Sequence, residues 1–228
     1  MNLISKLNEG MGAIEGSECV DDVYFKYNIR DRGKILLTFG PANSEDDRHY
    51  SKKEGADGSI IPWCFKLAET SDINVISFQH IERNNYYRSS EFIQFMKELA
   101  PLMSTFKERL AYGSSQGGFG VGAFSGLLNI DRVLLFHPVS TKNRNIVPWD
   151  TRPSTELSQS LGWDGECNDV SMGNAKGHVV IDPLSSIDVM HAKRFNLNII
   201  KVYGLGHGAG MTFLSRLGVL KEVFFIHK

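Results

Sequence analysis

Residues 109–120 read RLAYGSSQGGFG, and this stretch decides the fold. It begins as a short apolar strand and continues as a glycine-rich helix, predicted from about Gln116 to Leu128. Between the two lies Gly-Ser-Ser-Gln-Gly at 113–117, a G-x-S-x-G motif at a strand-to-helix turn. Such a turn strains its middle residue, Ser115, and places the hydroxyl at a helix N-terminus, where negative charge is favoured. The motif predicts Ser115 as a nucleophile, and the alternative is a glycine-rich loop without chemistry.

The predicted helix carries glycines at a regular spacing. Gly118, Gly122 and Gly126 recur every four residues and so share one helical face. Each glycine costs roughly 0.8–1 kcal/mol relative to alanine inside a helix. We therefore expect this helix to lie pressed closely against the sheet.

Apolar strands and helical stretches alternate along the rest of the chain. Strands are predicted at 23–29, 34–39, 73–78, 109–113, 132–137, 178–182 and 197–203, and helices at 61–69, 90–99, 187–195 and 209–225. Alternation implies parallel pairing and a three-layer α/β/α sandwich. We expect the first two strands to pair as an antiparallel N-terminal hairpin. The prediction is a single domain over 1–228, with 138–176 as a short insertion or minimal lid.

Net charge, apolar runs and cysteine spacing exclude several classes of protein. The 228 residues carry a formal net charge of −1, which is unlike a dedicated nucleic-acid binder. No apolar run approaches the ~20 residues of a membrane span, and the first residues have no apolar core of a secretory signal. The three cysteines form no C-x-x-C, so neither a zinc cage nor a disulfide framework is predicted. Reduced thiols favour a cytoplasmic protein.

A serine nucleophile needs a base and an acid, which in this kind of fold follow it in the order acid, then histidine. His207 lies in GLGHGAG (204–210), directly after the last predicted strand, and is the predicted base. Two acids are candidates. Asp182 ends the strand HVVID, and Asp188 follows a short loop at the start of a helix. Each also has a purely local role as a cap of the turn or helix that follows it.

An oxyanion hole needs two N–H donors. One is expected from the backbone of Gln116, and the other from the loop after the strand KILLTF. Pro41 in that loop has no N–H, so Gly40 or Ala42 must donate, or else the side chain of Asn43.

The sequence resembles the serine α/β-hydrolases, the esterase- and lipase-like superfamily, from about residue 22 to 225. Within it, the chain is similar to small bacterial hydrolase-like proteins that tend to be associated with surface-polysaccharide loci. The shared features are GSSQGG (113–118), DVMHA (188–192) and LSRLGVL (214–220). The resemblance implies hydrolase chemistry without a cofactor and favours Asp188 as the acid. Pro41 and the short insertion depart from the superfamily pattern.

Other residues have two interpretations each. His137 and Trp149 are candidate substrate contacts, or else a buried histidine and a packing anchor; Trp163 and the pair Tyr86–Tyr87 leave the same choice. Asp188, His191 and His207 form a weak candidate metal set, and we expect no metal.

The predicted function is hydrolysis of a carboxylic ester with a short acyl group, on a small molecule or a glycan, through an acyl-enzyme. Two alternatives stay open. One is an acyltransferase that uses the same residues, and the other is a non-catalytic binding or assembly protein.

Overall fold

The computed structural model describes residues 2–10, 12–42, 53–54, 60–70, 73–81, 86–152 and 162–207. The helices are α1 (Leu3–Asn8), α3 (Phe65–Glu69), α4 (Ser90–Met103), α5 (Gln116–Phe124) and α7 (Ser186–Lys193). The strands are β1 (Ile14–Val20), β2 (Val23–Ile29), β3 (Lys34–Phe39), β4 (Lys53–Glu54), β5 (Ile60–Ile61), β6 (Asn74–His80), β7 (Glu108–Ser114), β8 (Arg132–Phe136), β9 (Lys176–Ile181) and β10 (Asn198–Lys201).

The main sheet has eight strands in the order β1-β2-β6-β3-β7-β8-β9-β10. The pairs from β6 through β10 are parallel, whereas β1 with β2 and β2 with β6 are antiparallel. The predicted α/β class, with a mostly parallel sheet and an antiparallel N-terminal hairpin, is confirmed. Because the strands from β6 through β10 and β3 run in one direction, their carboxyl ends meet at one edge.

The hairpin is made by a different pair of strands than the sequence predicted. Strand β2 pairs with β1, and β6 lies between β2 and β3, so 23–29 and 34–39 are not neighbours. Strand β1 lies at the sheet edge and buries only Ile14, so its sequence, IEGSECV, lacks the apolar pattern by which a strand is predicted. The turn between β1 and β2 uses Asp21 at φ +52°.

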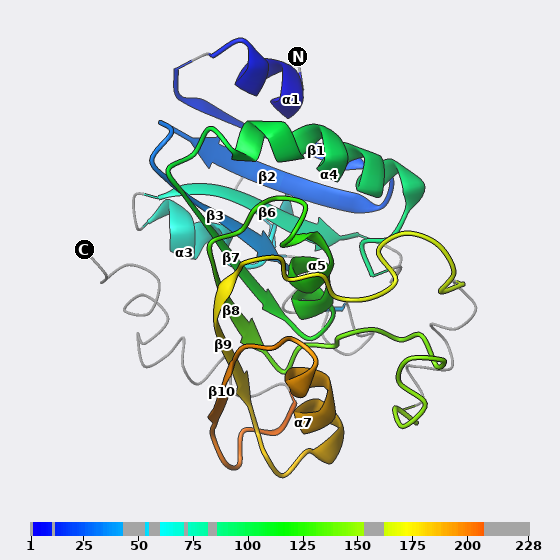
Figure 1. The fold of residues 1–228 in the computed structure, drawn as a ribbon. Coiled ribbons are helices and arrows are strands. Elements are labelled where there is room, and N and C mark those ends of the chain that lie inside the picture. The colour runs from blue at the N-terminus through cyan, green and yellow to red at the C-terminus, as the bar shows by residue number, and fades with distance from the viewer. Residues whose placement is uncertain are drawn as a thin grey trace.

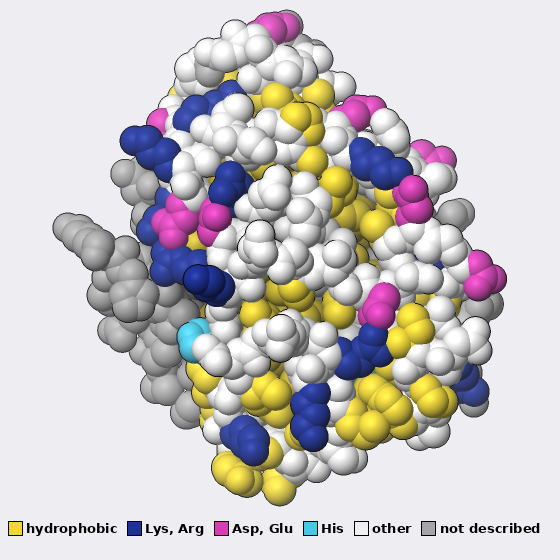
Figure 2. Space-filling view, in the orientation of Figure 1, with side chains coloured by type: hydrophobic (Ala, Val, Ile, Leu, Met, Phe, Trp, Pro, Cys, Tyr) yellow, Lys and Arg dark blue, Asp and Glu magenta, His cyan; other side chains and the backbone are white. Residues whose placement is uncertain are grey.

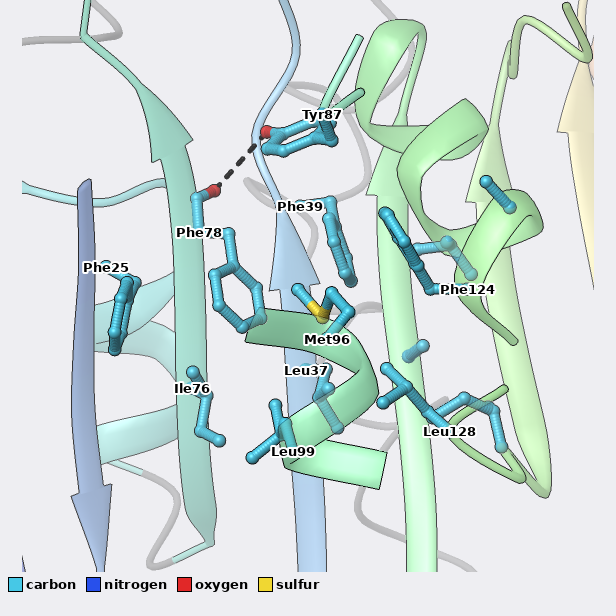
Figure 3. Close-up of a cluster of buried hydrophobic side chains, with 14 of the residues drawn as sticks. Phe25, Leu37, Phe39, Ile76, Phe78, Tyr87, Met96, Leu99, Phe124 and Leu128 are labelled. Atoms are coloured by element: carbon cyan, nitrogen blue, oxygen red, sulfur yellow. Dashed lines mark hydrogen bonds between the residues drawn. The ribbon is translucent and has the colours of Figure 1, made fainter. Parts of the chain in front are cut away.

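Two apolar clusters cover the two faces of the sheet. Alternate residues of β3 divide between them, because successive side chains of a strand point to opposite faces. Leu37 and Phe39 join the larger cluster with residues of α4 and α5, as Figure 3 shows, while Leu36 joins the smaller one with Phe65 of α3. Helices α4, α5 and α7 thus cover one face and α3 the other, which makes the expected three layers (Figure 1).

Two predicted helices differ from the structure. The stretch 61–69 ends strand β5 and forms helix only from Phe65, because Cys64 has φ +64°, outside the helical region. Helix α4 runs past Pro101 to Met103. The predicted helix 209–225 lies outside the described residues.

The glycines of α5 allow close approach on two sides. A Cβ at Gly117 would collide with the backbone of Phe39 in β3, so this glycine faces the sheet. At Gly118 it would meet Pro138, and at Gly122 it would meet Val170. The four-residue face predicted to press on the sheet therefore packs against loop residues instead, and a different glycine contacts β3.

The outer surface carries scattered charge. On the face drawn in Figure 2, Lys and Arg side chains lie singly or in small groups among acidic and apolar side chains. Within the described ranges, no helix has the length and apolar character needed to cross a bilayer. Cys19 is exposed and the other two cysteines are half-buried, and all three are free thiols.

Candidate active site

Ser115 lies at the turn between β7 and α5. It has φ +52° and ψ −114°, which matches the strained conformation expected there. Its backbone is fixed on both sides: the Ser115 N–H donates to the Phe136 carbonyl at 2.9 Å, and the Val139 N–H donates to the Ser115 carbonyl at 3.0 Å. The half-buried side chain is thereby aimed out from the sheet edge.

His207 follows β10 and reaches Ser115 across the sheet edge. The distance from Ser115 Oγ to His207 Nε2 is 3.0 Å. The His207 side chain is 42% exposed, so the pair is open to solvent. Gly206, with φ +57°, turns the backbone just before the histidine, a conformation that glycine adopts without strain.

Asp188 meets the other nitrogen of the same ring. Its carboxylate oxygens lie 3.0 and 2.9 Å from His207 Nδ1. The residue is in the first turn of α7, where Ser185 caps the helix by accepting from the Asp188 N–H. Burial alone would raise its pKa, but His137 and His207 outweigh burial and hold the pKa of the Asp188 carboxyl well below its usual range. The carboxylate is therefore ionised at neutral pH.

Asp182, the other candidate acid, binds backbone groups. It accepts from the Leu184 N–H at 3.0 Å and from the Gly206 N–H at 2.9 Å. Those two N–H donors lower the pKa of Asp182. Asp182 thus ties the end of β9 to the loop that carries His207, and it is Asp188 that lies against the ring.

The predicted oxyanion donors lie on two neighbouring elements. Gln116 is the first residue of α5, so its N–H has no carbonyl partner inside the helix. The Gly40 N–H donates to the Phe78 carbonyl at 2.9 Å and is engaged in the sheet, which leaves Ala42 as the backbone candidate. The side chain of Tyr87 supports this loop, since its hydroxyl donates to the Gly40 carbonyl at 2.8 Å. Asn43 lies outside the described residues.

His137 lies just after β8, at φ +41°, with its side chain 1% exposed. This burial argues against the predicted substrate contact. The Nδ1 atom is 3.7 Å from Asp188 Oδ2, and the ring centroid is 5.6 Å from that of His207. Neither ring nitrogen has a hydrogen-bond partner among the residues that the structure describes.

The aromatic candidates lie in packed surroundings. Trp163 and Tyr86 are buried and contact each other with ring centroids 5.5 Å apart, so packing accounts for both. Trp149 is half-buried and meets the His191 ring at 4.6 Å. Tyr87 is fully buried beside Phe39. Substrate contact by Trp149 stays a prediction.

Behind Asp188 lies a buried cluster of charged residues that the sequence did not reveal. Lys142 Nζ and the Arg152 guanidinium both bind the Asp150 carboxylate, at 2.9 Å and at 2.8 and 2.9 Å. Arg152 NH1 also donates to Asp188 Oδ1 at 3.3 Å. His191 Nε2 is 3.0 Å from Asp150 Oδ2. We name these residues, Lys142, Asp150, Arg152 and His191, the acid-support cluster. Charged residues in a polar segment give no periodic signal by which the cluster could be found.

A metal is one further possibility for these side chains. Among the described residues, His137, Asp188 and His207 bring potential ligand atoms within 4.8 Å of one another, whereas His191 of the predicted set faces Asp150. Arg152 already pairs with Asp188, and its positive charge opposes a second cation there. We assign no metal to the group.

Solved structures share this architecture, while no family model and no curated protein matches the sequence. Capsule O-acetyltransferase of Neisseria meningitidis serogroup A superposes with a TM-score of 0.58 and 15% identity, over 90% of this chain and 92% of that chain. A substituted form of it in complex with CoA gives 0.57 and 13%, over 96% and 99%. Est1E from Butyrivibrio proteoclasticus gives 0.53 and 12%, over 94% and 98%.

The protein has the α/β-hydrolase fold. At these identities the likeness shows the fold and not the reaction. In an α/β-hydrolase fold, a serine at the strand-to-helix turn, an acid after a later strand and a histidine after the last strand converge at one sheet edge. Ser115, Asp188 and His207 occupy those three places here.

Proposed function

We propose that the protein is a serine enzyme that transfers the acyl group of a carboxylic ester, with water as the ordinary acceptor. The observation that carries the proposal is the continuous chain of contacts from Ser115 Oγ through the His207 ring to Asp188. A serine hydroxyl becomes a strong nucleophile only with such a base beside it and an acid that orients the base.

Each residue then has a defined task. His207 Nε2 takes the proton of Ser115 as Oγ attacks the ester carbonyl, and the same proton goes to the leaving alcohol. Asp188, held ionised, keeps the remaining ring proton on Nδ1 and stabilises the imidazolium. The N–H of Gln116, with that of Ala42, stabilises the oxyanion. Water activated by His207 then releases the acid and restores the serine.

Transfer to a sugar hydroxyl is a second candidate, and the comparisons support it specifically. The capsule O-acetyltransferase shares this fold, and one of its forms is in complex with CoA. The same acyl-enzyme would pass its acyl group to an alcohol in place of water, so acetyl-CoA is the donor to test. A glycan as acceptor or substrate, and a cytoplasmic location, both stay predictions.

The deciding experiment labels the protein with a fluorophosphonate probe and maps the modified residue. We expect the label on Ser115 and its loss in Ser115→Ala, together with a fall of several orders of magnitude in turnover of p-nitrophenyl acetate. Ser114→Ala is the matched control and keeps the label. Label on Ser114, or none at all in the folded wild type, contradicts the proposal. Acetyl-CoA with a saccharide acceptor then separates transfer from hydrolysis.

A further inference from the structure

We infer that Arg152 is a positioning residue for Asp188, which it holds in place for contact with the His207 ring. The inference rests on the proposed function, because it assigns Arg152 a part in the action of Asp188 and His207. It comes from a contact between the segment 138–152 and helix α7 rather than from any motif.

The first step is the geometry of the guanidinium. Arg152 makes two contacts with Asp150, from Nε to Oδ1 at 2.8 Å and from NH2 to Oδ2 at 2.9 Å. This two-pronged contact fixes the plane of the guanidinium. The remaining nitrogen, NH1, points to Asp188 Oδ1 at 3.3 Å. Arg152 NH1 and His207 Nδ1 thus both contact Asp188 Oδ1, and the two groups hold the carboxylate at once.

The second step is the rigidity of the support behind Arg152. Asp150 and His191 are fully buried, and the Lys142 side chain is 1% exposed. His191 Nδ1 accepts from the Ser140 N–H at 3.1 Å, and its Nε2 lies 3.0 Å from Asp150 Oδ2 and 2.9 Å from Arg152 NH2. With Lys142 on the same carboxylate, Asp150 has a fixed orientation, and so has the guanidinium that it holds.

The third step is electrostatic. Asp188 and His207 are faced by Arg152, by His137 at the end of β8 and, through its backbone contact at Gly206, by Asp182. Lys142, Asp150 and His191 lie one contact further away. The negative charge of Asp150 and the positive charge of Lys142 largely cancel each other at Asp188. Arg152 is the arginine in direct contact with Asp188. A positive charge there favours the ionised form of the Asp188 carboxyl.

The expected effect follows directly. A carboxylate that Arg152 holds in place orients the His207 ring and stabilises the imidazolium, which forms only as the reaction proceeds. Removing Arg152 therefore lowers kcat and leaves KM little changed.

The test compares Arg152→Gln with Arg194→Gln. Arg194 is the C-cap of the same helix α7 and pairs with Asp169 in a part-buried contact, so it is a matched arginine away from the site. We expect kcat for p-nitrophenyl acetate to fall roughly tenfold in Arg152→Gln with KM little changed, and both values to stay near those of the wild type in Arg194→Gln. Wild-type kcat in Arg152→Gln, or an equal fall in both variants, overturns the inference.

A second variant and a second readout keep the test decisive. Arg152→Lys retains the charge and loses the two-pronged contact, so we expect kcat to fall several-fold while KM stays in place. Wild-type kcat in Arg152→Lys would overturn the positioning role even if Arg152→Gln does not fold. The ¹H shift of the His207 Nδ1–H group, which reports its hydrogen bond to Asp188, is expected to change in Arg152→Gln and not in Arg194→Gln. This readout needs no ester turnover, and so separates this inference from the proposed function.

Discussion

Two aspartates follow β9, and at the scale of single residues they have different tasks. Asp188 contacts the His207 ring, and Asp182 accepts two backbone N–H groups, one of them from Gly206 beside His207. A carboxylate that contacts the His207 ring orients the ring and stabilises its charged form. A carboxylate that accepts from the loop backbone fixes the position of the loop that carries the ring. The two residues therefore affect catalysis by different routes.

Substitution of each aspartate by asparagine distinguishes these routes. Asp188→Asn is expected to lower kcat by up to ~10⁴, because the amide favours the wrong ring tautomer. Asp182→Asn keeps one acceptor for the loop, and we expect a fall of roughly tenfold, with the pH profile unchanged. Steady-state kinetics on p-nitrophenyl acetate measure both. A larger loss in Asp182→Asn than in Asp188→Asn would reverse the assignment.

Asp150 links the acid-support cluster to stability. Burial alone would raise its pKa, but hydrogen bonds from His191, Arg152 and Lys142 outweigh burial and hold the pKa of Asp150 far below the usual range. In the unfolded chain an aspartate titrates near ~3.9. The stability tied to Asp150 is therefore fully present above about pH 5 and is lost as the pH falls below that unfolded value.

Urea unfolding between pH 7 and pH 3 tests this linkage. We expect Asp150→Asn to lower the free energy of unfolding at pH 7 by about 3–5 kcal/mol, because Lys142 and Arg152 lose their buried partner. The variant should also lose stability less steeply below pH 4. Asp21→Asn, at an exposed turn, is the control and should follow the wild type. An equally steep acid loss in Asp150→Asn contradicts the linkage.

At the scale of elements, the loop after β3 is held by the segment that follows β6. Tyr86 and Tyr87 have φ +60° and +59°, which is costly for two successive bulky residues. The strain coincides with a chain of contacts: the Tyr87 N–H donates to His80 Nε2 at 3.0 Å, and the Tyr87 hydroxyl donates to the Gly40 carbonyl. Ala42 lies two residues after Gly40, so the contact of Tyr87 holds the start of the predicted oxyanion loop.

Tyr87→Phe removes only the hydroxyl and tests this element. We expect stability to fall by about 1 kcal/mol and kcat to fall several-fold with little change in KM, because the oxyanion forms only in the transition state. Tyr27→Phe is the control. Its hydroxyl is hydrogen-bonded to Lys6 and Glu18 in the first part of the chain, so it should lose stability without losing kcat. Equal kcat values in the two variants would exclude the role of Tyr87.

Elements with strong apolar patterns could be predicted from the sequence, and weakly patterned ones could not. The bounds predicted for the buried strand INVISF and the helix SEFIQFMKEL differ from those of β6 and α4 by one or a few residues. Strand β1 and helix α1 were missed, since β1 buries only Ile14 and α1 has six residues. Pairing was predicted from chain order, which fails where β6 enters between β2 and β3.

The residues of the candidate site also divide into those that the sequence predicted and those that it did not. The sequence predicted Ser115, His207 and the two candidate aspartates, because turn glycines and strand ends mark their positions. Arg152 was not, since its contact with Asp188 joins residues 36 apart through a segment without regular structure. His137 was named for substrate contact because it ends a strand at the right edge, but burial is a property of the packed fold.

At the scale of the whole molecule, the first part of the insertion 138–176 packs inward. Val139, Thr141 and Val147 are buried, and Lys142 and Asp150 pair beneath them. The first part of the segment thus supports the sheet edge and the acid from behind, instead of forming an apolar cover over Ser115. Residues 153–161 lie outside the described ranges. That the insertion is a lid stays a prediction.

This arrangement bears on the length of the acyl group. Enzymes that act on long acyl chains bury them against a broad apolar surface, and each buried methylene contributes ~0.8 kcal/mol. Val139 and Val147 of this segment are buried in the core, so they offer little to a long chain. We expect kcat/KM on p-nitrophenyl esters to be highest for acetyl or butyryl and to fall from six carbons upward. Ser115→Ala supplies the background rate for each ester. A maximum at eight carbons or more would show that an apolar acyl site exists at this sheet edge after all, and would refute the short-chain preference.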